Sequence, residues 1–351
     1  MSETWDPAGF KDRVDAELDG FLSEEAGELL AVDASLKPVA EQLRQAAAHG
    51  KRLRAAFCYW GWRAAGQPDG EALLRAAASM ELVHAAATVH DDLIDDSPLR
   101  HSLPTPHVAL REAVPGRPGT RAAAARCLAI LVGDHLMSLA GRLFVTSGLP
   151  AAYLARARPV WDALARELIA GECLEILHTG AGPDPGVSLK VARFKTAKYT
   201  VEQPLLIGAR LAGAAPALRA GLSAYGLPLG EAFQLRDDLL GLFGETGRTG
   251  KAALDDIRAH RPTTLLALAW QTAGPAERDR LTALLGRRDL DEEHLHEVRE
   301  LLLSLKAPEQ VEDLIASRVG EAVGRLDGLG LPGHARRALA ELARLATDRH
   351  R

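Results

Sequence analysis

The sequence predicts an all-α protein. Ala, Leu, Arg and Glu dominate its long segments, β-branched residues are scarce in them, and alternation with a period of two residues is hard to find. Apolar residues make up 47% of the 351 residues and charged residues 25%, as in a globular protein with a real core. We therefore expect a single helical domain over residues 1–351.

The expected helices are separated by breaks rich in glycine and proline. The longest break, "GETGRTGKAALDDIRAHRPTT" at 244–264, is a candidate lid, because long loops inside a compact domain are usually functional. No stretch resembles a flexible linker, and no fixed-period repeat is found. We expect helices over 8–31, 36–48, 70–96, 120–146, 151–178, 188–213, 216–243 and 291–304, with a further apolar helix beginning near Ala55.

Charge and cysteine content exclude several classes of function. The formal net charge of −5 gives no reason to expect a nucleic-acid partner. Cys58, Cys127 and Cys173 are far apart and lack metal-ligand spacing, so neither a disulfide framework nor a zinc site is expected. The first residues lack the apolar core of a signal peptide, and runs such as "CLAILVG" are far shorter than the roughly 20 residues of a membrane span. We expect a cytoplasmic protein without a membrane span.

The segment "VHDDLIDDSPLR", residues 89–100, places four aspartates at the end of an apolar helix. Asp91 stacks over Asp95, and Asp92 over Asp96, so like charges repel. The dipole of a helix already presents partial negative charge at this end. Something must offset this cost. On the same helix, four polar side chains fall close to one line: His84, Thr88, Asp91 and Asp95.

A second helix, "GEAFQLRDDLLGLFG", also carries paired carboxylates, Asp237 and Asp238, with Gly244 as its expected cap. One such pair could be a solvated helix end, but two beside apolar faces favour bound cations. Mg²⁺ binds a few carboxylates together with substrate phosphates. A calcium loop competes with this interpretation, although "DDLIDD" lacks the alternating ligands and the central glycine of an EF-hand.

Phosphates that complete the metal shells also need cations from the protein, and the sequence supplies them. Arg54 suits a bidentate hold on phosphate oxygens and Lys51 a point-charge contact. Each taken alone is more often a surface charge. The cations recur beside glycines, threonines and acidic motifs: Lys51, Arg52, Arg54, Arg100, Lys195, Lys198 and Lys251.

Six motifs in order resemble those of the trans-isoprenyl diphosphate synthases of the polyprenyl synthetase family. "GKRLR" (50–54) and "ELVH" (81–84) resemble the homoallylic diphosphate site, and "DDLIDD" (91–96) the first aspartate-rich motif. "KTAKYT" (195–200), "GEAFQLRDD" (230–238), and Lys251 with Asp255-Asp256 follow in order. The resemblance implies a helical bundle of the isoprenoid synthase type with a central active-site cavity, and a homodimer.

The sequence departs from the family pattern at four places. Arg100-His101-Ser102 stands where two arginines and a glycine are usual, so one contact with the allylic diphosphate would be either weakened or supplied by a partly protonated His101. Gly241 replaces a frequent third aspartate, and Arg261 a lysine. Glu172 and Glu175 in "GECLEIL" stand where glutamine and aspartate are usual.

The resemblance implies head-to-tail elongation with isopentenyl diphosphate as the acceptor of an allylic group. Magnesium ions, three with bound diphosphate, held by Asp91, Asp95 and Asp237, would stabilise the departing diphosphate. No dedicated base is evident, and the released diphosphate itself is expected to take the proton. The catalytic set would be Asp91, Asp92, Asp95, Lys195, Asp237 and Asp238. The substrate-binding set would be Lys51, Arg54 and His84 for isopentenyl diphosphate, and Arg100, Lys195, Thr196, Gln234, Lys251 and Arg261.

Product length is expected to depend on the helix before Asp91. Ala87 lies roughly 6 Å and Val83 roughly 12 Å further back, at 1.5 Å per residue. Ala86 and Ala87 leave no bulky floor one turn down, where short-product members often carry aromatic side chains. We therefore expect geranylgeranyl diphosphate, although "HAAATVH" could simply be a strong helix former, and C15 or C25 and longer products stay open.

Three other classes of protein stay open. A class I terpene cyclase uses similar ionisation, and "DDLLGLFGE" resembles its second metal motif, with Glu245 as a ligand. A cyclase does not need the acceptor site of Lys51, Arg54 and His84. The others are a non-catalytic subunit of a synthase heteromer and a helical scaffold whose acids only increase solubility.

Overall fold

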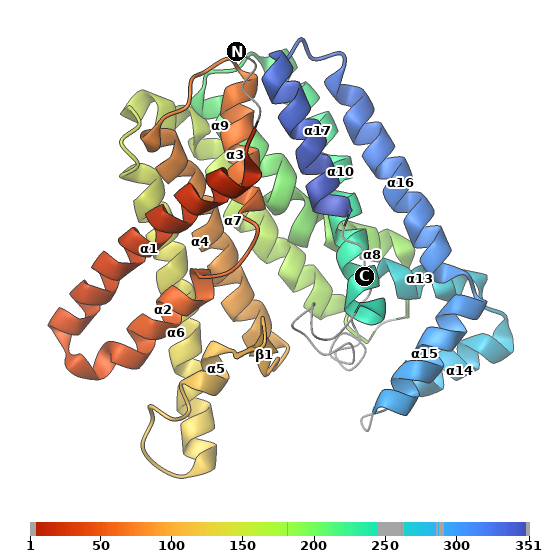
Figure 1. Ribbon diagram of the computed structural model, residues 1–351. Coiled ribbons are helices and arrows are strands. Elements are labelled where there is room, and N and C mark those ends of the chain that lie inside the picture. Colours follow the sequence, from red (N-terminus) through yellow and green to blue (C-terminus); the bar gives the residue numbers. More distant parts are fainter. Residues whose placement is uncertain are drawn as a thin grey trace. The chain divides into compact units, whose positions relative to one another are not determined.

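The computed structural model describes residues 5–180, 182–244, 261, 263–285, 287 and 291–348. These residues are almost entirely helical, which confirms the predicted all-α class. The chain forms two compact units (Figure 1), each described below by itself. The first comprises Met1–Arg158 and Ile207–Ala214, and the second Pro159–Leu206 and Ala215–Arg351. The single domain over 1–351 stays a prediction.

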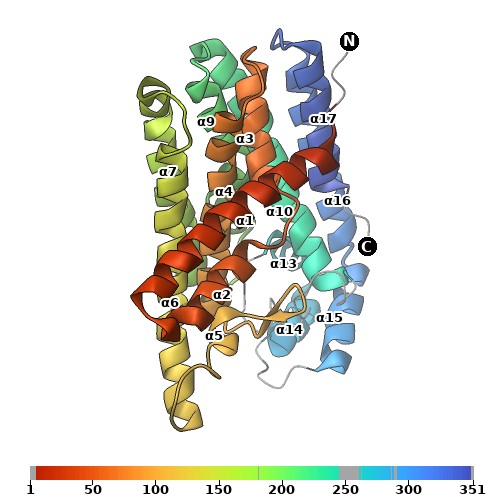
Figure 2. The same cartoon turned by 60° about the vertical axis from the view of Figure 1, so that its left-hand side comes forward.

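The first unit is organised around α4, which α1, α2, α3 and α6 contact. Helix α1 runs obliquely across α2 and α4 (Figure 2). Asp6 caps α1 by accepting hydrogen bonds from the backbone of Ala8 and Gly9. The elements are α1 (Pro7–Val32), the 3₁₀-helix η1 (Ala34–Leu36), α2 (Lys37–Ala47), α3 (Leu53–Ala64), α4 (Glu71–Ile94), β1 (Leu99–Arg100), β2 (Leu103–Pro104), α5 (Pro106–Ala109), α6 (Pro118–Val145), and the first residues of α7 (Ala151–His178).

The second unit is organised around α10, which contacts η2, α13, α16 and α17. Leucine, alanine and valine side chains of α10, α13, α15 and α16 form its buried core. Its elements after α7 are α8 (Pro185–Val191), the π-helix η2 (Ala192–Glu202), α9 (Gln203–Leu211, which continues into the first unit), α10 (Pro216–Phe243), α13 (Thr264–Thr272), α14 (Pro275–Leu285), α15 (Glu292–Ser304), α16 (Ala307–Leu326) and α17 (Gly333–Thr347).

The predicted helices at 151–178 and 216–243 have the expected bounds, whereas the one at 188–213 is wrong in form. That segment is divided into α8, η2 and α9, with a π-helix in the middle. Gly244 does end α10 as its C-cap, but its ψ of 159° is extended rather than left-handed.

By length and composition alone, α4 and α6 could each cross a membrane. The core helix of a soluble protein passes the same test, and 72% of the relevant stretch of α4 is buried, against 44% of that of α6. Burial therefore accounts for the apolar character of α4. For α6 the absence of a membrane span stays a prediction.

Candidate functional site

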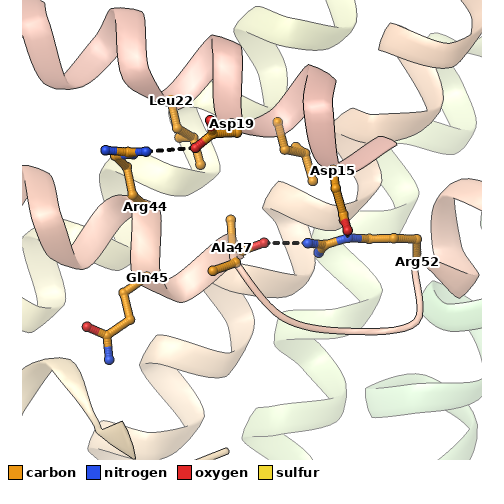
Figure 3. Close-up of a pocket in the computed structure, with 9 residues that line it drawn as sticks. Asp15, Asp19, Leu22, Arg44, Gln45, Ala47 and Arg52 are labelled. Atoms are coloured by element: carbon orange, nitrogen blue, oxygen red, sulfur yellow. Dashed lines mark hydrogen bonds and ion pairs between the residues drawn. The ribbon is translucent and has the colours of Figure 1, made fainter. Parts of the chain in front are cut away.

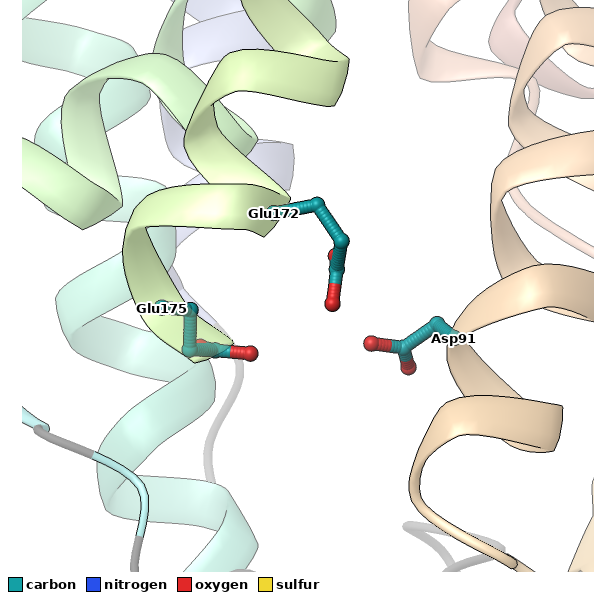
Figure 4. A group of neighbouring side chains, drawn as sticks. All are labelled: Asp91, Glu172 and Glu175. Carbon is teal, nitrogen blue, oxygen red and sulfur yellow. The ribbon is translucent and has the colours of Figure 1, made fainter. Parts of the chain in front are cut away.

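The last turns of α4 carry the first acidic motif, and its two leading aspartates have different surroundings. Asp91 (Figure 4) is partly exposed, whereas Asp92 is 1% exposed. The guanidinium of Arg100 donates to Asp92, with Nη2 2.5 Å from Oδ1 and Nε 3.1 and 3.2 Å from the two carboxylate oxygens. Its Nη2 also lies 3.3 Å from Oδ2 of Asp91. The guanidinium of Arg100 therefore offsets part of the repulsion between the aspartates at the end of α4, for which the sequence alone showed no compensating group.

Arg100 reaches these aspartates because the chain turns back directly after α4. Strand β1 pairs with β2 in a two-residue hairpin, with Leu99 opposite Pro104. The turn residues His101 and Ser102 have φ of 52° and 63°, the left-handed values of a type I′ turn. Burial alone would lower the pKa of Arg100, but the hydrogen-bonded carboxylates of Asp92 and Asp91 outweigh it and raise that pKa.

The other two aspartates lie beyond the last helical residue, Ile94. Asp95 is the C-cap of α4, and its backbone N–H donates to the carbonyl of Asp91. Asp96 has a left-handed backbone with φ of 55° and pairs with Arg126 at 2.7 Å and with His107 at 3.4 Å. Asp96 is therefore stabilised by Arg126, a cation of the first unit itself.

The segment before α3 carries the second set of predicted binding residues. Lys51 is exposed, and Arg54 is 7% exposed. The N-cap residue of α3, Arg52, makes no capping hydrogen bond with its side chain. Instead Oε1 of buried Glu81, on α4, accepts a hydrogen bond from the backbone of Ala55 at 2.9 Å. Glu81 thus ties the start of α3 to α4, where a helix N-terminus favours a carboxylate.

His84 lies one turn after Glu81 on α4, in a positively charged environment. Its Nδ1 lies 3.4 Å from Oγ1 of Thr88. Burial lowers the pKa of His84 well below 6.5, and the charges of Arg54 and Arg100 lower it further. The first unit therefore gathers Arg54, Arg100 and a neutral histidine, a combination suited to a polyanion.

The imidazole of His101 belongs to the same region, with its ring centroid 5.4 Å from that of His49. Burial lowers the pKa of His101, and Arg100 lowers it further. Both effects favour the neutral imidazole in the protein without a ligand, and the contact of a partly protonated His101 with the allylic diphosphate stays a prediction.

In the second unit, Glu172 and Glu175 project from one face of α7 (Figure 4). Both pair with Lys195: Oε2 of Glu172 lies 2.9 Å from Nζ, and Glu175 makes a short hydrogen bond with the same ammonium. The three side chains are only 13–19% exposed. Lys195 thus sits in a local group of three charges with a net charge of −1.

Lys195 belongs to the π-helix η2, whose backbone packs against two glycines. A Cβ on Gly171 of α7 would overlap the backbone nitrogen of Lys195, and a Cβ on Gly230 of α10 would overlap the carbonyl oxygen of Ala197. Thr196 is buried, with 9% exposure. Only glycine permits this approach, so the two glycines set the position of the "KTAKYT" segment.

On α10, Asp238 makes contacts within the second unit. Its Oδ1 accepts from Nε2 of Gln234 at 2.7 Å, and its Oδ2 lies 3.4 Å from the backbone nitrogen of Thr264 at the start of α13. Asp237 is partly exposed. Asp238 on α10 is thus engaged by donors of its own unit, as Asp92 on α4 is by Arg100.

Several predicted residues lie in or near the segment after α10. Lys251, with Asp255-Asp256 and Glu245, lies outside the described residues, as does most of the lid predicted at 244–264. Arg261 is partly exposed, and its carbonyl accepts a hydrogen bond from the backbone of Thr263 at 2.8 Å. The lid and the role of Lys251 stay predictions.

The sequence argument missed three contributions. Glu81 was part of a quoted motif but received no role, although a glutamate in an otherwise apolar helix face is a usable signal. The pairing of Asp92 with Arg100, and of Glu172 with Lys195, joins residues 8 and 23 positions apart. No local pattern predicts such partners.

Comparison with known proteins identifies the relatives of the chain. The family model described as polyprenyl synthetase matches residues 36–302. A (2E,6E)-farnesyl diphosphate synthase of Mycobacterium tuberculosis is 31% identical over 308 residues, covering 86% of this chain and 80% of the relative. A nonaprenyl diphosphate synthase of the same organism is 30% identical over 305 residues, covering 86% and 84%.

A solved structure is similar along nearly the whole chain. It is a geranylgeranyl pyrophosphate synthase from Corynebacterium glutamicum complexed with isoprenyl diphosphate and magnesium, 35% identical, with a TM-score of 0.93, covering 99% of this chain and 100% of that one. The relatives make products of different lengths, so they establish the reaction class and leave the product open. The chain belongs to the polyprenyl synthetase family and is a magnesium-dependent trans-prenyltransferase.

Proposed function

We propose that the protein condenses isopentenyl diphosphate with an allylic diphosphate and releases geranylgeranyl diphosphate. The observation that carries the acceptor half is the grouping of Arg54, His84 and Arg100 in the first unit, where burial and then the two cations lower the pKa of His84. A bound diphosphate would reverse that effect, because nearby negative charge favours the imidazolium. Lys51, Arg54 and His84 hold the acceptor so that its double bond faces the allylic carbon.

The allylic diphosphate is bound by Arg100 and Lys195, with Thr196, Gln234, Lys251 and Arg261 as further contacts. Asp91, Asp95 and Asp237 are the proposed magnesium ligands, and their hard carboxylate oxygens suit that ion. Magnesium, which we expect as three ions, supplies Lewis-acid stabilisation of the leaving group. Asp92 and Asp238 are not proposed as metal ligands. Asp92 orients Arg100, and Asp238 accepts a hydrogen bond from Gln234. The released diphosphate takes the proton of the condensation.

Product length is the finer part of the proposal, and it rests on the small side chains that precede Asp91 on α4. Ala87 lies one turn before Asp91 and is partly exposed, whereas Ala86 is fully buried. We therefore expect a larger side chain at position 87 to block the growing chain in this turn. Ala87→Phe should shorten the main product to C15, and Ala86→Phe should mainly destabilise the fold, as measured by mass spectrometry of the products and by thermal melting.

One assay tests the proposed reaction. Purified protein is incubated with Mg²⁺, an allylic diphosphate, and isopentenyl diphosphate present or omitted, and the products are identified by mass spectrometry. We expect elongated diphosphates only when both substrates are present, and a large loss with Lys51→Ala. Turnover of the allylic substrate alone that Lys51→Ala leaves unchanged would instead establish a cyclase, and no turnover of any substrate would contradict the proposal.

We also propose a homodimer in the cytoplasm. On α6, the side chains of Ile130, Leu131 and Val145 are 45%, 60% and 56% exposed, and a second copy of the chain would cover them. The three cysteines are free, as a reducing compartment permits. Leu131→Glu should convert the dimer to monomer in light scattering after gel filtration. A wild-type protein that is monomeric at micromolar concentration would refute the dimer.

A further inference from the structure

Arg52 lies between the two predicted acceptor ligands, Lys51 and Arg54, but its side chain points into the protein. It is 3% exposed, and all three guanidinium nitrogens donate to protein oxygens. Nε lies 2.5 Å from Oδ1 of Asp15 on α1, Nη1 2.9 Å from the carbonyl of His49, and Nη2 2.7 Å from that of Ala47. Figure 3 shows Arg52 pointing towards Asp15 and Ala47.

These bonds hold the chain where it turns from α2 into α3. Ala47 is the last residue of α2, and a carbonyl at a helix C-terminus has no partner within the helix. Gly50 has φ of 122°, and Arg52 itself has φ of 57°, a left-handed conformation that is unfavourable for a residue with a side chain. The contacts of the guanidinium stabilise this conformation. These contacts fix the backbone of Arg52, which directly follows Lys51 and lies two residues before Arg54.

The same region contains a second aspartate–arginine ion pair, whose arginine lies within α2 rather than in this turn. A cavity of about 270 Å³ between α1 and α2 is lined by Asp15 and Arg52, and also by Asp19 and Arg44. Nη2 of Arg44 lies 2.8 Å from Oδ1 of Asp19 (Figure 3). Both of these side chains are exposed, and Arg44 is within α2 rather than in the turn. Both pairs therefore join an aspartate of α1 to an arginine, but Arg52 belongs to the turn and Arg44 to α2.

We propose that Asp15 and Arg52 form a positioning pair that holds the 47–52 turn so that Lys51 and Arg54 meet the acceptor diphosphate. Arg52 is not itself a ligand of the diphosphate, because its nitrogens already donate to the protein. The pair acts through Lys51 and Arg54. This inference rests on the proposed function, since it assigns the acceptor diphosphate to that turn.

The charge of Asp15 supports a persistent pair. Partial burial would raise the pKa of Asp15, but hydrogen bonds from Lys11 and Arg52 outweigh it and keep that pKa below its usual value. The carboxylate is therefore ionised throughout the neutral range. A charge-assisted hydrogen bond of this kind is stronger than one between neutral groups.

The test is steady-state kinetics of Asp15→Asn and Arg52→Lys with both substrates. Asparagine keeps the shape of the aspartate and removes its charge, and lysine keeps the charge of the arginine but not its planar fork. We expect the KM for isopentenyl diphosphate to rise about tenfold in each variant, because displacing a binding group by a fraction of an ångström is costly. The kcat and the KM for the allylic diphosphate should stay within about twofold of wild type, because the pair acts on the acceptor site alone.

Three controls make the result specific. Arg44→Gln removes the second aspartate–arginine ion pair, and Lys11→Ala removes the other partner of Asp15, and both should leave the KM for isopentenyl diphosphate unchanged. In a Lys51→Ala, Arg54→Ala background, Asp15→Asn should have no further effect on that KM, as expected of a group that acts through those residues. Thermal melting checks that each variant is folded.

Three results would overturn the inference: an unchanged KM in Asp15→Asn, a parallel loss in kcat and both KM values, or full additivity with the double alanine variant. Failure of the proposed function is distinguishable, because it would show in the wild type as an indifference to isopentenyl diphosphate.

Discussion

Replacing Glu172 with glutamine tests how the protein sets the charge around Lys195. The ammonium of Lys195 is held by two carboxylates, those of Glu172 and Glu175, so the group carries a net charge of −1. Glutamine keeps the length of the side chain and its ability to accept a hydrogen bond. The variant makes this group of three side chains neutral and keeps the pair of Glu175 with Lys195.

The expected gain follows from the distances. Glu172 lies 2.9 Å from Nζ of Lys195, so a phosphate oxygen bound at a similar distance on the opposite side of Nζ would be about 6 Å from the carboxylate. Two unit charges about 6 Å apart repel by about 3 kcal/mol at an effective dielectric constant of about 20. Partial exposure and salt reduce this to about 1.4 kcal/mol, which is a factor of about ten.

We therefore expect Glu172→Gln to lower the KM for the allylic diphosphate about tenfold at fixed Mg²⁺, with the KM for isopentenyl diphosphate unchanged. The assay is initial-rate kinetics with each substrate varied in turn. Glu167→Gln is the matched control, because it breaks the 2.8 Å pair of Glu167 with Lys198 in the same unit. An unchanged or increased allylic KM would refute the electrostatic argument, and an increased Mg²⁺ requirement would show that Glu172 binds metal instead.

Three further predictions concern backbone and charge. Gly171→Ala should destabilise the protein by about 1–3 kcal/mol in urea unfolding and lower kcat, because the added methyl overlaps the backbone of Lys195. Ser102→Gly should stabilise the protein by about 0.5–1 kcal/mol in the same measurement, since glycine adopts φ of 63° without strain. The free energy of unfolding should fall as the pH drops below about 6.5, by up to about 1.4 kcal/mol per pH unit for each of His84 and His107. Burial lowers the pKa of both imidazoles in the folded protein, so below that pH the unfolded chain binds more protons than the folded one.

Each of these predictions has a control. Gly141→Ala, on α6 with open space around it, should be neutral or stabilising, and a loss equal to that of Gly171→Ala would contradict the overlap argument. The control for Ser102→Gly is the reverse change at Gly66, which has φ of 80°. Gly66→Ser should lower the free energy of unfolding by about as much as Ser102→Gly raises it. A double variant His84→Asn, His107→Asn should reduce the slope of the pH dependence between about 7 and 5, leaving the part that His101 contributes, and an unaltered slope would exclude these two histidines as its source.

Much of the fold was accessible from sequence because helix formation depends on local pattern. The bounds of α7 and α10 were predicted correctly, and the aspartate motifs were recognised because six motifs follow in the order typical of the family. The residue types also indicated the chemistry, since carboxylates and basic groups in this order are typical of metal-assisted diphosphate binding.

The sequence determined which segments are helical and which carry charge, because propensity and periodicity are properties of neighbouring residues. Only the tertiary structure decided which charged side chains form ion pairs: Arg100 with Asp92, Glu172 with Lys195, and Arg52 with Asp15. It also placed a π-helix where one regular helix was expected, with Gly171 and Gly230 packed directly on its backbone. These outcomes depend on contacts between distant segments, and many partners are compatible with the same local pattern.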